Sequence, residues 1–271
     1  MSIMESKVVF VGAGNMAEAI VSGMLAESFC APEKIVMTDI RPERLTDLEN
    51  EYGVTVSTDN SVVKNAEMVV LAVKPQVLPE VLKDLAADLR PETLIISIAA
   101  GISTAKIEST LGGERRVVRV MPNTPALVGQ GASALAAGSN ADEADLEVTE
   151  AILQCVGLAV RVEETDMDAV TALSGSGPAY VFYLLEGMLA ASEKMGLDEE
   201  TARWLALKTV EGAARLMTDS GETAEALREK VTSKGGTTEA AVRLLDKAGV
   251  KKAVVKAILA ARKKSVELSQ G

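Results

Sequence analysis

The sequence predicts an α/β protein in which a doubly wound parallel-sheet domain is followed by an all-helical domain. The first half alternates short β-branched runs with helical stretches, the pattern of parallel strands joined by crossover helices. The second half has no convincing strand and consists of long stretches rich in Ala, Leu, Glu and Lys. The character of the chain changes after about Val162, so the expected domains are residues 1–162 and 163–271.

The predicted strands of the first domain are short, nearly continuous in apolar residues, and bounded by Gly, Pro or charged residues. They are Lys7–Val11, Lys34–Thr38, Met68–Val73, Leu94–Ile98 and Val117–Val120. Helical stretches lie between them, at Met16–Ser28, Pro42–Glu51, Val77–Leu89 and Thr104–Leu111. Pro42 and Pro79 fall near helix starts, where a missing N–H group costs nothing.

Six helices are predicted in the second domain, and short connectors, several with a glycine suited to a helix end, separate them. They are Asp166–Leu173, Ala179–Lys194, Glu199–Ser220, Ala224–Lys230, Glu239–Ala248 and Lys251–Leu268. The stretch Tyr180–Ala191 is apolar almost all round, so it must be buried on several sides. One small helical domain offers too few neighbours, and we therefore expect a homodimer through this domain, leaving open whether dimers assemble further.

The composition excludes several classes of function. A net charge of −11 with no Lys/Arg-rich run argues against a nucleic-acid partner. With no histidine, a zinc site and a Ser-His-Asp triad are excluded, and the two cysteines lack metal-ligand spacing. We find no signal-peptide pattern and no apolar run of membrane-spanning length. The expectation is a soluble cytoplasmic protein with reduced thiols, no metal and no membrane association.

A glycine-rich fingerprint, G-A-G-N-M-A over residues 12–17, follows the first strand directly and opens a helix. Gly12 permits the tight turn, Gly14 lets the backbone approach a pyrophosphate, and Ala17 is small enough for close helix–strand packing. The helix N-terminus would then point at the anion. This context predicts a Rossmann-type dinucleotide site, although a glycine turn of this kind can also serve an α/β fold that binds something else.

The end of the second strand carries two conflicting signals for the cofactor. Asp39 lies about where a ribose 2′ group would arrive, and an acidic residue there favours the free hydroxyl of NAD. Arg41 is equally close and could hold the 2′-phosphate of NADP. Asp39 could also simply end the strand, so the residues alone leave the choice open.

Further cofactor contacts are expected at the carboxyl ends of later strands, where ligands bind in open α/β sheets. The complete set of expected cofactor-binding residues is Gly12, Gly14, Asn15, Met16, Asp39, Arg41, Asn60, Ala72, Val73, Lys74, Pro75, Ala100, Gly101 and Asn123. Small residues at these ends would let a flat nicotinamide ring lie against the backbone. Lys74 has an alternative interpretation as a solvated strand end.

Two Ser/Gly segments precede helices in the second half, at residues 172–180 and 231–242. Helix N-termini offer unpaired N–H groups and a partial positive charge, so both segments are interpreted as sockets for a carboxylate. In the second segment two adjacent glycines clear the approach, and hydroxyl donors flank them. The alternative is that Thr237 or Thr238 merely caps the following helix.

These two segments, together with V-M-P-N-T-P-A at residues 120–126, GAGNMA and AVKPQ, resemble the pyrroline-5-carboxylate reductase family over essentially the whole chain. The resemblance implies an oxidoreductase of proline biosynthesis that reduces 1-pyrroline-5-carboxylate to L-proline with NADPH or NADH, often preferring NADPH. It also implies a substrate site built from Ser174, Gly175, Ser176, Ser233, Gly235, Gly236, Thr237 and Thr238. Thr238, the expected catalytic residue, would hydrogen-bond the ring nitrogen while hydride passes to C5 of the imine.

One departure from the family pattern and two rival functions accompany this interpretation. Family members usually have proline where this chain has Lys234, which puts the rigidity of the loop and substrate affinity in doubt. Glu222 could help to hold or deliver a proton. A β-hydroxyacid dehydrogenase would need a catalytic lysine opening a long helix, where this chain has the Ser/Gly segment. A non-catalytic NAD(P)H sensor would need no carboxylate socket.

Overall fold

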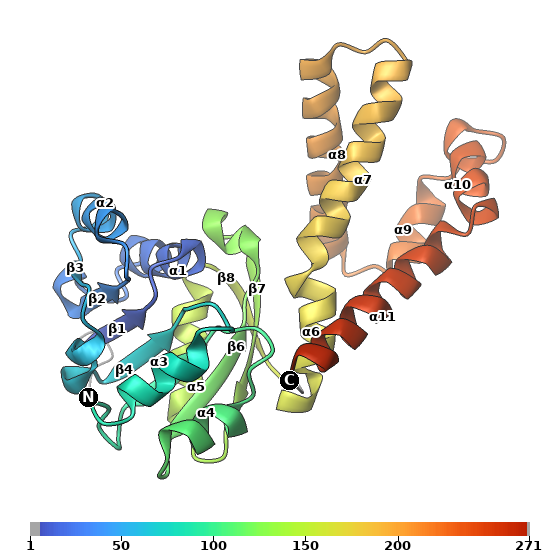
Figure 1. Cartoon of the computed structure of the whole chain (residues 1–271). Helices are drawn as coiled ribbons and strands as arrows, with labels where there is room; N and C mark the ends of the chain where they lie inside the picture. The colour runs from blue at the N-terminus through green and yellow to red at the C-terminus, as the bar shows by residue number, and fades with distance from the viewer. Residues whose placement is uncertain (1–5, 270–271) are drawn as a thin grey trace. The chain divides into compact units, whose positions relative to one another are not determined.

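The computed structural model describes residues 6–269 (Figure 1). By its internal contacts the chain divides into two compact units. The first runs to Ser176 and includes the C-terminal segment from Ala261, and the second comprises Gly177–Ala260. Within the first unit, the buried Ser265 hydroxyl donates a hydrogen bond of 2.6 Å to Asp168, which ties the C-terminal segment to this unit. The domain boundary expected at residue 162 stays a prediction.

The described part of the first unit forms one eight-stranded sheet in the order β3-β2-β1-β4-β5-β6-β7-β8. The strands are β1 (Val8–Val11), β2 (Ile35–Thr38), β3 (Thr55–Ser57), β4 (Met68–Leu71), β5 (Leu94–Ser97), β6 (Arg116–Met121), β7 (Gly131–Ala137) and β8 (Gly157–Arg161). β1 to β6 are mutually parallel, β7 runs antiparallel to β6, and β8 runs parallel to β7. The predicted doubly wound parallel sheet is confirmed, with all five predicted strands in place.

Three strands were not predicted, each for a sequence reason. β3 is only three residues long and polar, so it carries no apolar signal. β7 reads GASALAA, and its alanines and glycine lack the β-branched side chains typical of strands. β8 exposes most of its residues, as expected at a sheet edge. These strands form through pairing with neighbours that the local sequence does not reveal.

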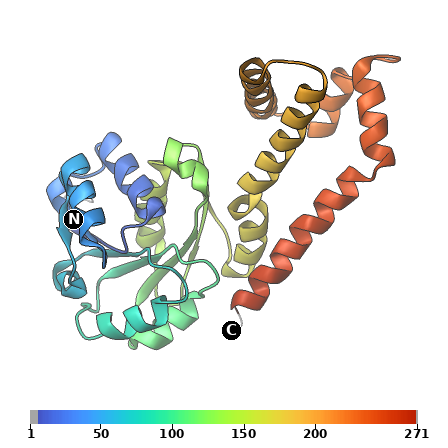
Figure 2. The same cartoon turned by 45° about the horizontal axis from the view of Figure 1, so that its top comes forward.

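Helices cover both faces of the sheet (Figure 2). The four residues of β1 are all buried and alternate between two apolar clusters. Val8 and Phe10 pack with α1 (Asn15–Ala26), α2 (Pro42–Tyr52) and α5 (Glu143–Gln154). Val9 and Val11 pack with α3 (Leu78–Leu85) and α4 (Thr104–Leu111). The two helical layers leave the carboxyl ends of the parallel strands as the edge where a ligand can bind.

Helix α5 was missed at the sequence level, although its start carries a readable signal. Asp142 accepts a hydrogen bond of 3.0 Å from the backbone N–H of Asp145, and Asp145 accepts one of 3.1 Å from the backbone N–H of Asp142. This reciprocal pair is a capping box. Asp145 also pairs with Arg116 of β6 at 2.8 Å, so the cap anchors the helix to the sheet.

The helical part of the chain contains each helix expected from the sequence. The elements are α6 (Met167–Val170), a π-helical segment η6 (Thr171–Gly175), α7 (Gly177–Lys194), α8 (Glu199–Ser220), α9 (Ala224–Lys230), α10 (Thr237–Lys247) and α11 (Val250–Ser269). α7 and α8 pack against each other as a hairpin, and the Asp198 side chain caps α8. Among residues 6–269, no helix has the length and apolar character needed to cross a membrane.

Few apolar side chains of the second unit are buried by its own helices. Ala202 and Ala206 are buried, whereas Phe182, Tyr183 and Trp204 are 60%, 78% and 63% exposed. Large aromatic side chains left in water on a helical surface mark a surface for another protein. The structure thus agrees with the sequence argument that Tyr180–Ala191 needs neighbours beyond this unit.

Candidate active site

The turn after β1 is shaped by Gly12, whose φ of +100° lies in the region that favours glycine. Its N–H group donates to the carbonyl of Thr38 at 2.9 Å, linking the ends of β1 and β2. A Cβ atom on Gly12 would lie 2.8 Å from three backbone atoms of Ala72 and Val73. Those atoms belong to the segment after β4, so the turn is packed tightly against the neighbouring strand end and only glycine fits.

Gly14 has a different role, because it is the N-cap of α1 with no side-chain cap of its own. A Cβ atom there would meet nothing within 4 Å, so the space beside Gly14 is open. The first helical hydrogen bond comes from the N–H of Glu18, at 3.0 Å from the Gly14 carbonyl. The N–H groups of Asn15 and Met16 therefore have no helical acceptor, and the open space at this helix N-terminus is suited to an anion.

Asp39 follows β2 and is fixed against the glycine turn. Its carboxylate accepts a hydrogen bond of 3.0 Å from the backbone N–H of Ala13 and forms two with the Arg41 guanidinium, at 2.9 and 3.0 Å. The hydrogen bonds from Arg41 and Ala13 lower the pKa of Asp39 to about 2, against the opposing effect of burial. The sequence left Asp39 and Arg41 as competing signals, and the structure joins them in one ion pair.

The other predicted cofactor residues lie at or after the carboxyl ends of the parallel strands. Asn60 accepts a hydrogen bond of 2.6 Å from the Thr38 hydroxyl, and Lys74 is exposed after β4. Gly101, with φ +74°, is buried after β5. The predicted set falls in the first unit after β1, β2, β4, β5 and β6, with Asn60 after the short β3, and parallel strands bring these ends to one edge.

Asn123, predicted as a cofactor residue, also makes structural hydrogen bonds that the sequence did not indicate. Its side-chain carbonyl accepts from the N–H of Ala132 at 2.8 Å, and its amide donates to the carbonyl of Ser174 at 3.0 Å. The side chain is therefore a joint between the end of β6, the start of β7 and the π-helical segment. This joint holds a predicted cofactor residue next to a predicted substrate residue within the first unit.

The segment around Ser174 stays helical beyond Leu173, where the predicted helix ends. Residues 171–175 form a π-helical turn between α6 and α7, in which the Ser176 N–H donates to Thr171 at 2.8 Å. The predicted helix end is therefore two residues early, because Ser174 and Gly175 belong to a turn closed by an i to i−5 hydrogen bond. A Cβ atom on Gly175 would lie 2.5 Å from Met121, so the glycine allows this turn to approach β6 closely.

The second predicted segment is a turn followed by a helix N-terminus. The Gly236 N–H donates to the Ser233 carbonyl at 3.0 Å, and Gly235 has φ +76°, which together define a type II turn. Gly236 is the N-cap of α10, so the alternative that Thr237 or Thr238 caps the helix is wrong. Both threonines belong to its first turn, beside N–H groups that have no helical acceptor.

Two side chains that support the predicted site, one at each glycine-containing turn, were not predicted from the sequence. The Glu239 carboxylate reaches back to accept from the Gly235 N–H at 2.7 Å, which fixes the turn before α10. Arg44 donates to the Ala13 carbonyl at 3.0 Å and pairs with Glu18, which braces the glycine turn from α2. An arginine in the first turn of the second helix was the available signal for this brace.

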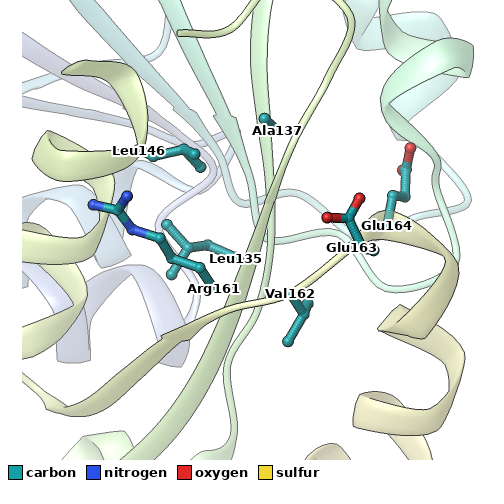
Figure 3. A pocket seen from close by; sticks show the side chains of 7 residues that line it. All are labelled: Leu135, Ala137, Leu146, Arg161, Val162, Glu163 and Glu164. Carbon is teal, nitrogen blue, oxygen red and sulfur yellow. The ribbon is translucent and has the colours of Figure 1, made fainter. Parts of the chain in front are cut away.

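A separate pocket of about 390 Å³ contains none of the predicted site residues (Figure 3). It is lined by Leu135, Ala137, Leu146, Arg161, Val162, Glu163 and Glu164. Arg161 pairs there with Glu143 and Glu150 of α5, so its charge is already neutralised. Ala137 pairs with Val118 near the start of β6, which places this pocket away from the carboxyl ends of the parallel strands. Within the part of the chain that the structure describes, this pocket included, no group of acidic or cysteine side chains could hold a metal ion.

A doubly wound sheet with a glycine turn, followed by helices, defines a protein of the Rossmann dinucleotide-binding class. Residues 164–268 match the family model described as pyrroline-5-carboxylate reductase dimerisation, and residues 7–101 match that described as coenzyme F420-dependent NADP oxidoreductase. The chain belongs to the pyrroline-5-carboxylate reductase family, which confirms the resemblance noted from its motifs.

Similar proteins cover the chain almost completely. Pyrroline-5-carboxylate reductases of Pseudomonas aeruginosa and Methanosarcina acetivorans are 44% and 42% identical, over 97% of this chain and 97% and 98% of theirs. The solved structure of the Coxiella burnetii enzyme superposes with a TM-score of 0.91 at 40% identity, covering 97% of this chain and 98% of that one. The Plasmodium falciparum enzyme, solved with NADP bound, gives a TM-score of 0.90 at 29% identity and covers 98% and 99%.

Proposed function

We propose that this protein reduces 1-pyrroline-5-carboxylate to L-proline with NADPH or NADH, the last step of proline biosynthesis. The observation that carries the proposal is that relatives bearing this activity in their names match the chain from end to end. The residues expected to act lie in two places, the glycine turn after β1 and the Ser/Gly/Thr segment before α10.

The glycine turn fits a dinucleotide. The open space at Gly14 and the unpaired N–H groups at the start of α1 suit a pyrophosphate, which a side chain on residue 14 would obstruct. When bound, a reduced nicotinamide supplies the hydride. The proposed cofactor-binding residues are those expected from the sequence, among which Asn123 contributes through its backbone because its amide is engaged elsewhere.

The residues before α10 bind and orient the substrate in this proposal. The N-terminal N–H groups of α10 and the hydroxyls of Ser233 and Thr237 hold the carboxylate, because the helix end favours negative charge. Thr238 holds the imine nitrogen, and the protonated imine is already an electrophile that needs alignment more than acid catalysis. Ser174, Gly175 and Ser176 complete the proposed substrate set.

The proposal includes a homodimer formed through the helical part of the chain, in the cytoplasm, with no nucleic-acid partner. The exposed aromatic side chains of Phe182, Tyr183 and Trp204 support such an interface, and a family model named for dimerisation covers this region. Sedimentation at several protein concentrations tests the dimer. A monomer at all concentrations would remove this part of the proposal.

The activity is tested by following oxidation of NADPH and NADH with and without the cyclic imine. In Thr238→Ala we expect turnover to fall by at least about tenfold, the value of one hydrogen bond to the reacting group, with nucleotide affinity unchanged. Thr46→Ala is the matched control, because Thr46 is an exposed threonine on α2 of the first unit.

Two results would contradict the proposal at different levels. Unchanged kinetics in Thr238→Ala would remove Thr238 from the mechanism while leaving the activity. Folded protein that binds nucleotide without imine-dependent oxidation would overturn the reductase assignment. A sensor of the nucleotide would then explain the site better.

A further inference from the structure

The contacts of Asp39 bear on which cofactor the protein selects, an inference that rests on the proposed function. The Asp39 side chain is 11% exposed and uses both carboxylate oxygens. One accepts from the backbone and side chain of Arg41, and the other from the Ala13 N–H and the Arg41 side chain. The carboxylate is therefore held in one position at the edge of the glycine turn, where the adenosine ribose of a bound dinucleotide arrives.

The charges around this position are already balanced within the protein. Asp39 is ionised at neutral pH, since its pKa lies near 2. Arg41, whose side chain is 56% exposed, pairs with Asp39, and Arg44 pairs with Glu18 and donates to the Ala13 carbonyl. A 2′-phosphate would bring further negative charge to a place where both guanidinium groups already have carboxylate partners.

The two cofactors differ only at this group, so the site must treat them differently. An uncharged ribose 2′-hydroxyl can donate to the Asp39 carboxylate in place of one Arg41 N–H group, whereas a phosphate can only accept and is repelled. Arg41 already gives two of its guanidinium hydrogen bonds to Asp39, so the charge of that carboxylate offsets the attraction that its remaining donors would offer a phosphate. We propose that Asp39 makes this enzyme select NADH over NADPH, with Arg41 held back from the 2′-phosphate by the same carboxylate. This order is the reverse of the preference that the family resemblance implied.

The test is the ratio of dissociation constants for NADPH and NADH, measured by the fluorescence of the bound reduced nicotinamide. In the wild type we expect NADH to bind more tightly by at least about tenfold, equivalent to about 1.4 kcal/mol. Asp39→Asn keeps an acceptor for the Ala13 N–H but removes the charge and releases Arg41. We expect it to move the ratio at least about tenfold towards NADPH.

The double variant D39N/R41A shows whether released Arg41 is what binds the phosphate. We expect it to lose the NADPH affinity gained by D39N and to bring the ratio back towards unity. The ratio is its own control for folding, because both nucleotides are measured on the same protein and share every contact except the 2′ group.

The outcomes separate the inference from the function on which it rests. Wild-type protein that binds NADPH as tightly as NADH or more tightly would overturn the inference, as would an unchanged ratio in D39N, and the reductase proposal would stand. Binding of neither nucleotide by folded wild-type protein would overturn the proposed function and the inference with it.

Discussion

Replacing each of the two glycines in the turn after β1 by alanine should affect a different property: stability at Gly12 and nucleotide affinity at Gly14. At Gly12 an alanine must adopt φ +100°, and left-handed backbone costs an L-residue about 1–2 kcal/mol. Its Cβ would also lie 2.8 Å from the backbone of Ala72 and Val73, and relieving such an overlap costs about 1–3 kcal/mol. We expect Gly12→Ala to lower the free energy of unfolding of the first unit by about 2–5 kcal/mol.

Gly14→Ala is the matched comparison, because the same methyl group enters open space at an ordinary backbone angle. The loss of stability should stay below about 1 kcal/mol, the scale of an N-cap change. The same methyl group would occupy the space proposed for the pyrophosphate. We therefore expect the affinity for both NADH and NADPH to fall at least about tenfold.

Thermal unfolding followed by circular dichroism measures the stability, and nicotinamide fluorescence measures the binding, on the same samples. The reasoning fails if Gly14→Ala unfolds as early as Gly12→Ala, because the structure shows nothing for its Cβ to strike. Wild-type nucleotide affinity in Gly14→Ala would show that the pyrophosphate does not bind at this turn. A Gly12→Ala protein as stable as the wild type would contradict the packing against the segment after β4.

Three further predictions concern stability. Glu164 accepts hydrogen bonds of 2.7 and 2.6 Å from the backbone N–H and hydroxyl of Thr104 at the start of α4, and it pairs with the buried Arg119 at 3.4 Å. Glu164→Gln should therefore cost at least about 1 kcal/mol in urea unfolding, whereas Glu163→Gln, at the exposed neighbour, should not. Ser28, at φ +54°, is the one described non-glycine residue with positive φ, and Ser28→Gly should raise the melting temperature by relieving about 1 kcal/mol; no rise would show that the backbone is unstrained. Lys234 occupies the turn position that favours proline, so Lys234→Pro should stabilise the helical unit by about 0.4–1 kcal/mol through the unfolded chain, and destabilisation would refute the type II turn.

Local signals predicted most of the secondary structure. Apolar runs bounded by glycine or charge gave the five central strands, because strands buried on both faces need apolar residues throughout. Asp198 and the glycine ends of helices α7 and α8 likewise follow from short-range capping. The missed elements, β7 and α5 among them, depend on partners elsewhere in the chain, so their own residues carry a weaker signal.

The same distinction between local signals and long-range contacts applies to the candidate site. The sequence located the glycine turn and the Ser/Gly/Thr segments, because helix N-termini and positive φ angles depend on residues next to one another in the chain. It could not show that residues 171–175 form a π-helical turn or that Asn123 joins β7 to that turn. Both depend on hydrogen bonds that close only after distant strands have paired.

The sequence by itself determined the family, the five central strands and the helices of the second half, and it predicted the residues for a dinucleotide and a carboxylate. Only the tertiary structure decided how Asp39 and Arg41 relate. In the sequence Asp39 and Arg41 lie two positions apart and favour different cofactors. In the folded chain they form one ion pair, and the Asp39 carboxylate accepts a hydrogen bond from the Ala13 N–H. The reason is physical: a hydrogen bond from the glycine turn 26 residues away orients the carboxylate, and no local pattern encodes that orientation.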